Sequence, residues 1–313
     1  MTAPRFSIIM NVYNGERFLR EALASVFAQT HRDWELIFWD DQSTDRSAQV
    51  LDSFAPDDRV RYFGAPVHTP LGPARDLAIA EARGEWLAFL DQDDIWTADK
   101  LEKQARLIDA RGSSSIAIVY GRTMKFGDLG MVRDFDHRHE FRDMPEGDIF
   151  DSLFVDSCYV CQSSTCLRTA CVRDVGPVPA DVHFCHDYFL LTELARKHEA
   201  ACVADVICWY RVHGNAMSNE YTMQVHWETM RIIERWRGHL DPAIYRRRYR
   251  IQSTIIGLRE VASGSDHAGG LARILRDGSV PYLFSRPFAL GYRWLRRAGR
   301  YAFYKGARRP TFT

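Results

Sequence analysis

Residues 34–46 read WELIFWDDQSTDR, an apolar stretch that ends directly in two adjacent aspartates. The same arrangement returns at residues 86–94, which read WLAFLDQDD. Carboxylates packed at one place repel each other, so each cluster costs stability unless a cation or a set of hydrogen-bond donors offsets it. The two stretches therefore predict strands that end at a site with a positively charged or hydrogen-bond-donating partner.

Strand-like and helix-like patterns alternate around these stretches. Short apolar runs predict strands over 6–12, 34–40, 60–64, 86–90 and 116–120. Helical spacing of apolar residues predicts helices between them, the first N-capped by Asn14, one starting near Pro73 and one over about 98–111. Strands that are apolar on both faces are typical of a mostly parallel central sheet flanked by helices, a Rossmann-like, doubly wound α/β fold.

In such a fold, ligands bind at the carboxyl ends of the strands. Both acidic clusters lie at such ends. The cluster after the second strand contains Asp40, Asp41 and Asp45, and the cluster after the fourth contains Asp91, Asp93 and Asp94. The acids are thus expected at the functional edge of the sheet.

The second half of the chain loses this alternation. Residues 121–148 are polar and contain glycine, which predicts a loop or hairpin. We expect a strand over 161–168, a helix over 187–198, and a strand followed by a loop over 202–218. From about residue 220 the sequence is typical of helices and is rich in arginine.

Composition narrows the function classes. The 313 residues contain 41 Lys and Arg and 41 Asp and Glu, so the overall charge gives no indication of a nucleic-acid partner. Neither a signal peptide pattern nor an apolar run of about 18 residues is apparent, which favours a cytoplasmic protein whose seven cysteines are reduced core residues. The spacing of Cys158, Cys161, Cys166 and Cys171 does not form two Cys-x-x-Cys knuckles, which disfavours a zinc site made by these four.

Asp91 and Asp93 form an Asp-x-Asp motif at a predicted strand end. Hard divalent cations take oxygen ligands and often bind one or two carboxylates together with substrate phosphates. A solvated turn is the alternative, but the position beside a second acidic cluster favours a metal–diphosphate site.

Asp41 and Arg75 are candidates for contacts with a nucleotide. Asp41 is placed to accept hydrogen bonds from a base N–H or from ribose hydroxyls, because Ser43 and Asp45 are better placed to cap the next helix. Arg75 lies near a helix start and could face a diphosphate there. Surface pairing of Arg75 with Asp76 or Glu81 is an equal alternative.

Two segments together resemble the family 2 glycosyltransferases, which are inverting enzymes of the GT-A fold. They are FSIIMNVYNGERFLREALASVFAQTHRDWELIFWDDQSTDRS and GPARDLAIAEARGEWLAFLDQDDIWTADKLEKQ. The likeness is dense over about residues 5–110 and looser over 145–218. The resemblance implies that Asn11, Tyr13 and Asp41 contact the base and ribose of the nucleotide, and that Arg75 lies beside the nucleotide. It also implies that Asp93 holds Mn²⁺ or Mg²⁺ on the diphosphate, and that Asp91 lies near the ribose or the waters of the metal.

The resemblance also implies a catalytic base. In the stretch HFCHDYFLL, Asp187 matches the family's general base, while His186 replaces the usual first acid of the pair. An N-cap-type carboxylate is the alternative for Asp187. In WYRVHGNAMS, residues 209–218, His213 is a candidate diphosphate contact or metal ligand, or simply an exposed side chain, and Asn215 and Ser218 are weaker candidates.

These likenesses imply a metal-dependent, inverting glycosyltransferase. It would move a hexosyl or deoxyhexosyl group from a nucleotide-diphosphate sugar to a hydroxyl of a glycan or lipid-linked acceptor in cell-surface polysaccharide synthesis. The motif DQDDIW and the loop WYRVHGNAMS together resemble the bacterial polysaccharide subgroup that includes rhamnosyltransferases. The alternative is a non-catalytic nucleotide-sugar or glycan-binding subunit of the same fold. Because Asp41, Asp93 and Asp187 are all present, the enzyme is favoured.

The implied organisation is a GT-A catalytic domain over 1–218, with a nucleotide-sugar half to about residue 120 and an acceptor half beyond it. A helical, basic extension covers 219–313. After Asp277 the sequence has no acid, and aromatic and basic residues interleave from Val280 to Pro310. Two interpretations of this tail stay open: peripheral contact with an anionic membrane at the inner face of the cell, or packing on the catalytic domain.

Overall fold

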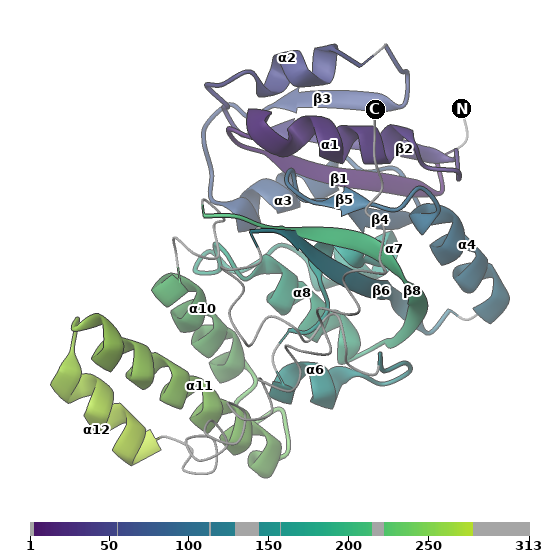
Figure 1. The fold of residues 1–313 in the computed structure, drawn as a ribbon. Helices are drawn as coiled ribbons and strands as arrows, with labels where there is room; N and C mark the ends of the chain where they lie inside the picture. The colour runs from purple at the N-terminus through teal and green to yellow at the C-terminus, as the bar shows by residue number, and fades with distance from the viewer. Residues whose placement is uncertain are drawn as a thin grey trace, which may run out of the picture. The chain divides into compact units, whose positions relative to one another are not determined.

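The computed structural model describes residues 3–54, 56–112, 114–128, 144–156, 158–214 and 222–277. The chain divides near residue 216 into two compact units (Figure 1). The predicted domain boundary at 218, the candidates Asn215 and Ser218, and the basic tail lie outside the described residues.

The first unit is built on one eight-stranded sheet. Its strands are β1 (Phe6–Val12), β2 (Trp34–Asp40), β3 (Val60–Gly64), β4 (Trp86–Phe89), β5 (Ile95–Trp96), β6 (Ile116–Gly127), β7 (Cys166–Arg168) and β8 (Glu199–Val212). They lie in the order β3-β2-β1-β4-β7-β6-β8-β5. Strands β1 to β4 are parallel to one another, β7 is antiparallel to both of its neighbours, β8 is parallel to β6, and β5 is antiparallel to β8. The carboxyl ends of β1, β2, β4 and β8 therefore point to the same edge.

Helices flank this sheet (Figure 1). They are α1 (Glu16–Phe27), α2 (Ser47–Asp52), α3 (Leu71–Ala80), α4 (Lys100–Arg111), α6 (Phe150–Asp156), α7 (Thr169–Val175) and α8 (His186–Ala195), with a 3-10 turn, η2, at Gln162–Ser164. Helix α3 packs against β1 and β2, and α4 packs against β6 and β8. The fold is the expected α/β fold with a largely parallel sheet.

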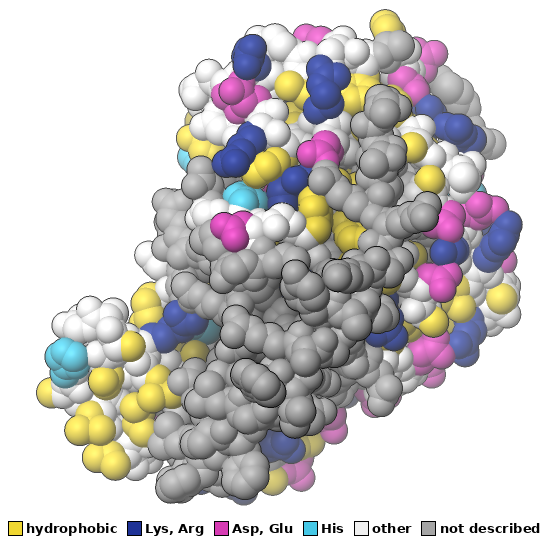
Figure 2. Space-filling view, in the orientation of Figure 1, with side chains coloured by type: hydrophobic (Ala, Val, Ile, Leu, Met, Phe, Trp, Pro, Cys, Tyr) yellow, Lys and Arg dark blue, Asp and Glu magenta, His cyan; other side chains and the backbone are white. Residues whose placement is uncertain are grey.

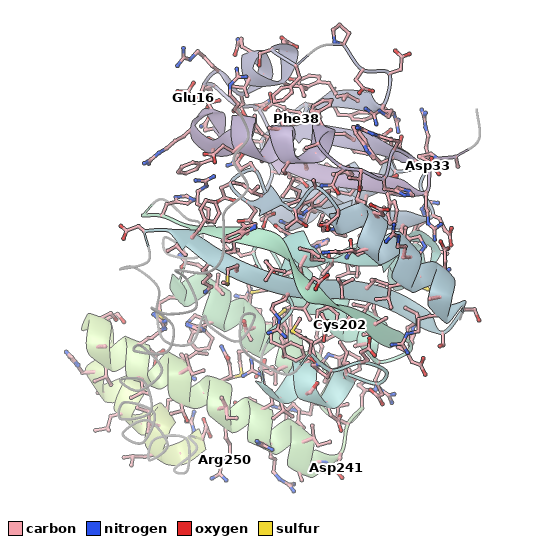
Figure 3. All side chains as sticks on the ribbon, turned by 45° about the vertical axis from the view of Figure 1, so that its right-hand side comes forward. Glu16, Asp33, Phe38, Cys202, Asp241 and Arg250 are labelled. Atoms are coloured by element: carbon pink, nitrogen blue, oxygen red, sulfur yellow. The ribbon has the colours of Figure 1, made fainter. Side chains whose placement is uncertain are left out.

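The core explains why the first strands read as apolar on both faces. All seven residues of β2 are buried, and Phe38, labelled in Figure 3, has no exposed surface. Trp34 and Trp86 are also almost fully buried. Each large apolar side chain buried in this way stabilises the fold by about 1.5–3 kcal/mol relative to exposure. This burial fixes the strands whose ends carry the acids.

Several local expectations were wrong. Asn14 does not cap α1: its backbone has φ of 49°, and its Oδ1 accepts a hydrogen bond from the Thr44 backbone N–H at 2.8 Å. The helix begins instead at Glu16, after Gly15. Residues 121–127 are not loop but continue β6, because they pair with β8.

The strand expected over 161–168 is only three residues long and runs antiparallel to its neighbours.

All seven cysteines are free thiols. No helix in the described part of the chain is long and apolar enough to cross a membrane. Acidic and basic side chains are interspersed over the visible described surface of the first unit (Figure 2).

The second unit contains three helices among the described residues, as its helical sequence predicted. They are α10 (Thr222–Arg235), α11 (Pro242–Ser263) and α12 (His267–Asp277), and α11 packs against both of the others. Asp241 caps α11 by accepting a hydrogen bond from the Ala243 backbone N–H at 2.6 Å. A Cβ atom on Gly257 would lie 2.7 Å from the Gly270 carbonyl oxygen, so the close approach of α11 and α12 requires glycine there.

Candidate active site

Asp41 follows β2 at the carboxyl edge of the sheet and is almost fully buried. Its carboxylate accepts hydrogen bonds from the Thr69 backbone N–H at 3.1 Å and from the Thr69 hydroxyl at 3.1 Å, and its Oδ2 lies 2.6 Å from His68 Nδ1. The His68 ring stacks in a tilted arrangement on Tyr13, with centroids 4.3 Å apart. Asp41 therefore already has partners within the protein, and the exposed Tyr13 ring provides a flat face beside it.

Asp40 and Asp45, the other acids of the first cluster, accept hydrogen bonds from backbone N–H groups of the turn after β2. The sequence predicted such a capping role for Asp45. Asp45 accepts a hydrogen bond from the Ser47 backbone N–H at 2.9 Å, at the start of α2. Asp40 accepts from the Ser43 backbone N–H at 2.8 Å and from the Tyr62 hydroxyl at 3.0 Å. The carboxylates of the first acidic cluster are thus offset by hydrogen-bond donors of the protein itself, some from the same turn and some from residues 62–69.

The second cluster forms a short turn after β4, here called the acidic loop, residues 91–94. Arg75 on α3 is 5% exposed and pairs with the Asp91 carboxylate. The surface pairing of Arg75 with Asp76 or Glu81 is therefore wrong. Desolvation raises the pKa of Asp91, the Arg75 guanidinium lowers it, and the carboxylates of Asp93 and Asp187 raise it.

Gln92 ties the acidic loop to the end of β1. Its side-chain oxygen accepts a hydrogen bond from the Tyr13 backbone N–H at 3.0 Å, and its side-chain nitrogen donates to the Tyr13 carbonyl at 3.2 Å. A Cβ atom on Gly15 would lie 2.5 Å from the Gln92 side-chain oxygen. Glycine at position 15 thus leaves room for the amide that joins the two strand ends.

Asp93 meets residues from the end of β8. His213 Nε2 lies 2.9 Å from Asp93 Oδ2, and the Arg211 Nε–H donates to the Asp93 carbonyl at 2.8 Å. The Arg211 guanidinium lies over the Phe18 and Phe126 rings at 4.4 Å from each centroid. The side chains of Asp93 and His213 are 26% and 13% exposed, so both remain accessible to a bound group.

Asp187 lies in the first turn of α8, where the helix dipole favours a negative charge. Its Oδ1 accepts a hydrogen bond from the Tyr188 backbone N–H at 2.7 Å. The Asp187 carboxylate contributes to raising the pKa of Asp91. The preceding His186 is buried, and its Nε2 lies 3.3 Å from Asp76 Oδ1 on α3.

Asn11, the remaining candidate, lies on β1 beside Trp39 of β2. Both polar atoms of its side-chain amide are buried and have no hydrogen-bond partner among the described residues. An unpaired buried amide is costly, so a partner that the protein itself does not supply would stabilise it.

The donor atoms of the second cluster suit a hard or borderline divalent cation. The Asp93 carboxylate and the His213 imidazole, whose Oδ2 and Nε2 atoms lie 2.9 Å apart, offer an oxygen and a nitrogen ligand. Such a pair is compatible with Mn²⁺ or Mg²⁺ completed by phosphate oxygens and water. These two residues could hold the cation, while Asp91 pairs with Arg75.

Among the described residues, Asn11, Tyr13, Asp41, Asp91, Asp93 and His213 lie at or just beyond the carboxyl ends of β1, β2, β4 and β8, and Arg75 pairs with Asp91. Asp187 is linked to this edge through α3, where Asp76 meets His186. Sequence reasoning missed three supporting residues, Gln92, Arg211 and His68. Gln92 is the middle residue of an Asp-x-Asp motif, and its amide is the signal that could have identified a bridge. Arg211 and His68 could not be found from spacing, because each acts across the fold on a residue distant in the sequence.

Comparison with solved structures gives the same fold. The S. aureus TarS 1-349 complex with UDP has a TM-score of 0.60 and 20% identity, with 92% of this chain and 79% of that chain covered. The mannosyltransferase PcManGT of Pyrobaculum calidifontis, solved with GDP-Man and Mn²⁺, has a TM-score of 0.59 and 17% identity, with 93% and 81% covered. At these identities the likeness shows the fold.

Curated relatives match mainly over the first part of the chain. The Escherichia coli glucosyltransferase WfgD, named for UDP-Glc and α-D-GlcNAc-diphosphoundecaprenol, is 37% identical over 115 residues, which is 37% of this chain and 44% of WfgD. An uncharacterized glycosyltransferase of Haemophilus influenzae is 40% identical over 105 residues, which is 33% of this chain and 42% of the relative. The chain thus spans less than half the length of these two relatives. The family model for glycosyl transferase family 2 matches residues 7–173, more than half of the sequence, and the chain therefore belongs to that family.

Proposed function

We propose that this protein is a metal-dependent, inverting glycosyltransferase. It would transfer a sugar from a nucleotide-diphosphate donor to a hydroxyl of a glycan or lipid-linked acceptor in cell-surface polysaccharide synthesis. The proposal rests above all on one observation: helix α3 links the two parts of the site, because Arg75 pairs with Asp91 of the acidic loop and Asp76 meets His186, the residue before Asp187.

The end of β1 and the end of β2 would hold the nucleoside. Tyr13 offers an exposed aromatic face, and Asn11 offers an amide whose polar atoms have no partner in the described chain. Asp41 would act together with His68 and Thr69, which hold its carboxylate in place. The nucleotides in the TarS and PcManGT complexes, UDP, UDP-GlcNAc and GDP-Man, support a nucleoside-diphosphate donor but do not select the base.

The diphosphate would lie over the acidic loop. Arg75 orients Asp91 through their ion pair, and His213 lies against Asp93. A divalent cation bound by Asp93, with Asp91 and His213 nearby, would supply positive charge to the departing diphosphate. The structural similarity to PcManGT, which was solved with GDP-Man and Mn²⁺, supports this choice of cation.

Asp187 would remove the proton from the acceptor hydroxyl. In an inverting transfer that hydroxyl attacks the anomeric carbon from the side opposite the leaving diphosphate, so one carboxylate must take up its proton. The hydrogen bond from the Tyr188 N–H occupies Oδ1 and fixes the carboxylate, which leaves Oδ2 to receive the proton. We further propose that residues 1–120 bind the donor and 121–218 the acceptor.

The most informative experiment is a donor screen that follows nucleotide release with and without Mn²⁺ or Mg²⁺. The proposal predicts release that depends on both an acceptor and the cation. Tight donor binding without release for any donor and acceptor tested would instead favour a non-catalytic nucleotide-sugar-binding subunit.

A further inference from the structure

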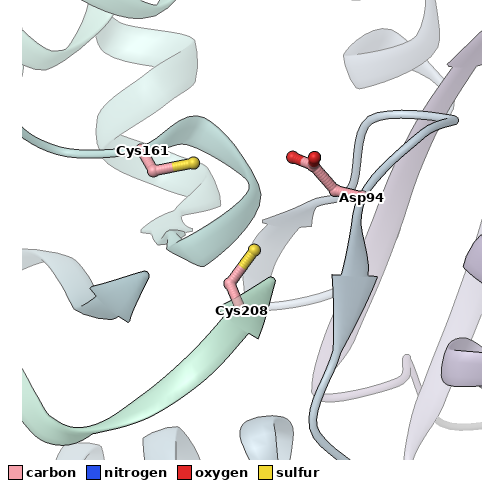
Figure 4. Close-up of side chains that lie close together, drawn as sticks. All are labelled: Asp94, Cys161 and Cys208. Carbon is pink, nitrogen blue, oxygen red and sulfur yellow. The ribbon is translucent and has the colours of Figure 1, made fainter. Parts of the chain in front are cut away.

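A cluster of two thiols and one carboxylate lies beside the acidic loop but takes no part in the proposed reaction. The ligand atoms of Asp94, Cys161 and Cys208 all lie within 4.8 Å of one another. Figure 4 shows the three side chains pointing toward a common centre from three separate segments. Asp94 ends the acidic loop, Cys161 precedes η2, and Cys208 lies on β8 opposite Trp96 of β5.

The carboxylate in this cluster is buried and incompletely paired. Asp94 is 1% exposed, and its Oδ1 accepts a hydrogen bond from the Arg211 backbone N–H at 2.9 Å. Its Oδ2 has no hydrogen bond of normal geometry among the described residues, and the Ser163 hydroxyl is the neutral donor near the carboxylate. A buried carboxylate oxygen without a partner is costly, so a positively charged ligand at the cluster would remove a real penalty.

The surrounding charge also suits a divalent cation. Two thiolates and one carboxylate carry three negative charges, and a divalent cation leaves one of them uncompensated. Lys100 is fully buried, and its ammonium group lies 3.8 Å from Cys166 Sγ and 4.0 Å from the centroid of the Trp96 ring, whose backbone pairs with Cys208. A divalent cation would offset two of the three charges, and the ammonium group near the cluster would partly offset the third.

We propose that Cys161 Sγ, Cys208 Sγ and Asp94 Oδ2 bind a thiophilic divalent cation, with Zn²⁺ as the best match. Zinc is bound by Cys at about 2.3 Å and by carboxylate oxygen at about 2.0–2.2 Å, which requires only a small contraction of the cluster. A water molecule would complete the tetrahedron. The Arg211 N–H that holds Oδ1 is the kind of outer hydrogen bond that orients a ligating carboxylate.

This site differs in chemistry from the candidate catalytic one. The acidic loop supplies oxygen and imidazole ligands through Asp93 and His213, whereas the cluster supplies two sulfurs. Soft ligands select zinc and related metals, and carboxylates with phosphate select Mg²⁺ or Mn²⁺. A cation at the cluster would join the acidic loop, β8 and the segment before η2, and so hold Asp93 in position without touching substrate.

The site can be tested spectroscopically on the full chain, without any activity measurement. The protein is freed of metal, kept reduced, and titrated with Co²⁺, whose bonds to thiolate sulfur give an intense near-ultraviolet charge-transfer band. We expect this band to saturate at one equivalent and to disappear when Zn²⁺ is added. Cys161→Ser and Cys208→Ser should each remove most of it.

Two variants serve as matched controls. Cys171→Ser changes another buried cysteine that is outside the cluster and should leave the band unchanged. Asp93→Asn should also leave it unchanged, which separates this site from the catalytic metal. Circular dichroism checks that Cys208→Ser, a change on a buried strand, remains folded; if it does not, Cys161→Ser alone decides.

Three outcomes would overturn the proposal. The first is the absence of a thiolate band in the reduced wild-type protein. The second is a band that survives Cys161→Ser in the folded variant. The third is a thiol count, in denaturant and before reduction, that is low by two in the wild type but not in Cys161→Ser, because it would identify a Cys161–Cys208 disulfide in place of a metal site.

Discussion

Asp93 is the residue on which metal binding depends most directly, because its carboxylate faces His213 and is partly exposed. Asp93→Asn keeps the shape of the side chain but removes its charge. We expect a loss of turnover on the order of 10²-fold or more, since charge stabilisation at a leaving group is among the largest catalytic terms. The free energy of unfolding should change by no more than about 1 kcal/mol, because the side chain is partly exposed and an ion pair of this kind contributes little.

Turnover and denaturant midpoints measured on the same preparations check this expectation. Wild-type protein that turns over at its full rate in excess EDTA would contradict the role of the metal. A large loss of stability in Asp93→Asn would instead mean that the His213 contact is structural.

Asp187 provides the second test at this scale. Asp187→Asn should bind the nucleoside diphosphate with unchanged affinity but transfer sugar about 10²–10⁴-fold more slowly, because an amide cannot accept the hydroxyl proton. Calorimetry measures the binding and nucleotide release measures the transfer. Near wild-type transfer by this variant would assign the base to another residue; the neighbouring His186, the next candidate by sequence, is buried against Asp76.

The candidate residues themselves could be predicted from the sequence, because strand ends and short motifs mark them. The side chains that pair with these residues could not be predicted in this way. Asp41 was expected to be free for a ligand, yet Thr69 and His68 hold it, and neither lies near it in the sequence. Only the chain path that brings residue 68 back to the end of β2 reveals this contact.

At the scale of elements, α3 joins the two halves of the site. Consecutive residues on this helix face in different directions: Arg75 pairs with Asp91 of the acidic loop, and Asp76 meets His186 at the start of α8. Asp76 also accepts a hydrogen bond from the Val178 backbone N–H at 2.8 Å. The helix therefore sets the position of the acidic loop relative to the candidate base.

The buried His186 gives this junction a pH dependence. Burial lowers the pKa of His186 below its ordinary value, although the hydrogen bond with Asp76 opposes the shift. The unfolded chain therefore binds a proton at a pH where the folded protein does not, and stability falls as the pH drops through about 6.5. His186→Gln should remove this component and flatten the loss of stability below that pH.

Urea midpoints of wild type and variant at a series of pH values measure the difference. His239→Gln, at an exposed position in the second unit, is the matched control and should follow the wild type. Parallel curves for wild type and His186→Gln would show that the histidine does not titrate differently in the two states.

The elements that sequence reasoning missed owe their structure to distant partners. Residues 121–127 contain Arg122 and Lys125 and read as polar, yet β6 continues through them because β8, about 80 residues later, pairs alongside. Lys125 is 4% exposed, with its ammonium group 5.5 Å from the Tyr210 ring centroid. Strand β5 has only two residues and forms by pairing with β8, so no local pattern could indicate it.

For the whole molecule, strand direction decides which residues meet. Because β8 runs parallel to β6 and ends at the same edge as β2 and β4, His213 arrives beside Asp93 although 120 positions separate them. The sequence predicted parallel strands for the first half, and that prediction is confirmed for β1 to β4. The strand expected within 161–168 is β7, but its antiparallel direction and its position between β4 and β6 could not be predicted from local patterns.

The basic tail is the segment through which the protein could bind the membrane surface and so reach a lipid-linked acceptor. From Val280 to Pro310 the sequence interleaves aromatic and basic residues without a single acid. Each Lys or Arg near an anionic surface contributes on the order of 1 kcal/mol, and salt screens this attraction. The membrane interpretation therefore predicts that the full chain sediments with anionic vesicles at low salt, but not with neutral vesicles or at high salt.

A version that ends at Gly278 should stay in the supernatant under all these conditions, because it retains the mixed charge of the rest of the chain but none of the tail. It should also keep its turnover with a soluble acceptor analogue, since the candidate site lies wholly before residue 214. Sedimentation of the shortened chain would move the membrane contact to another surface. If both versions stay in solution, the tail packs on protein and does not recruit lipid.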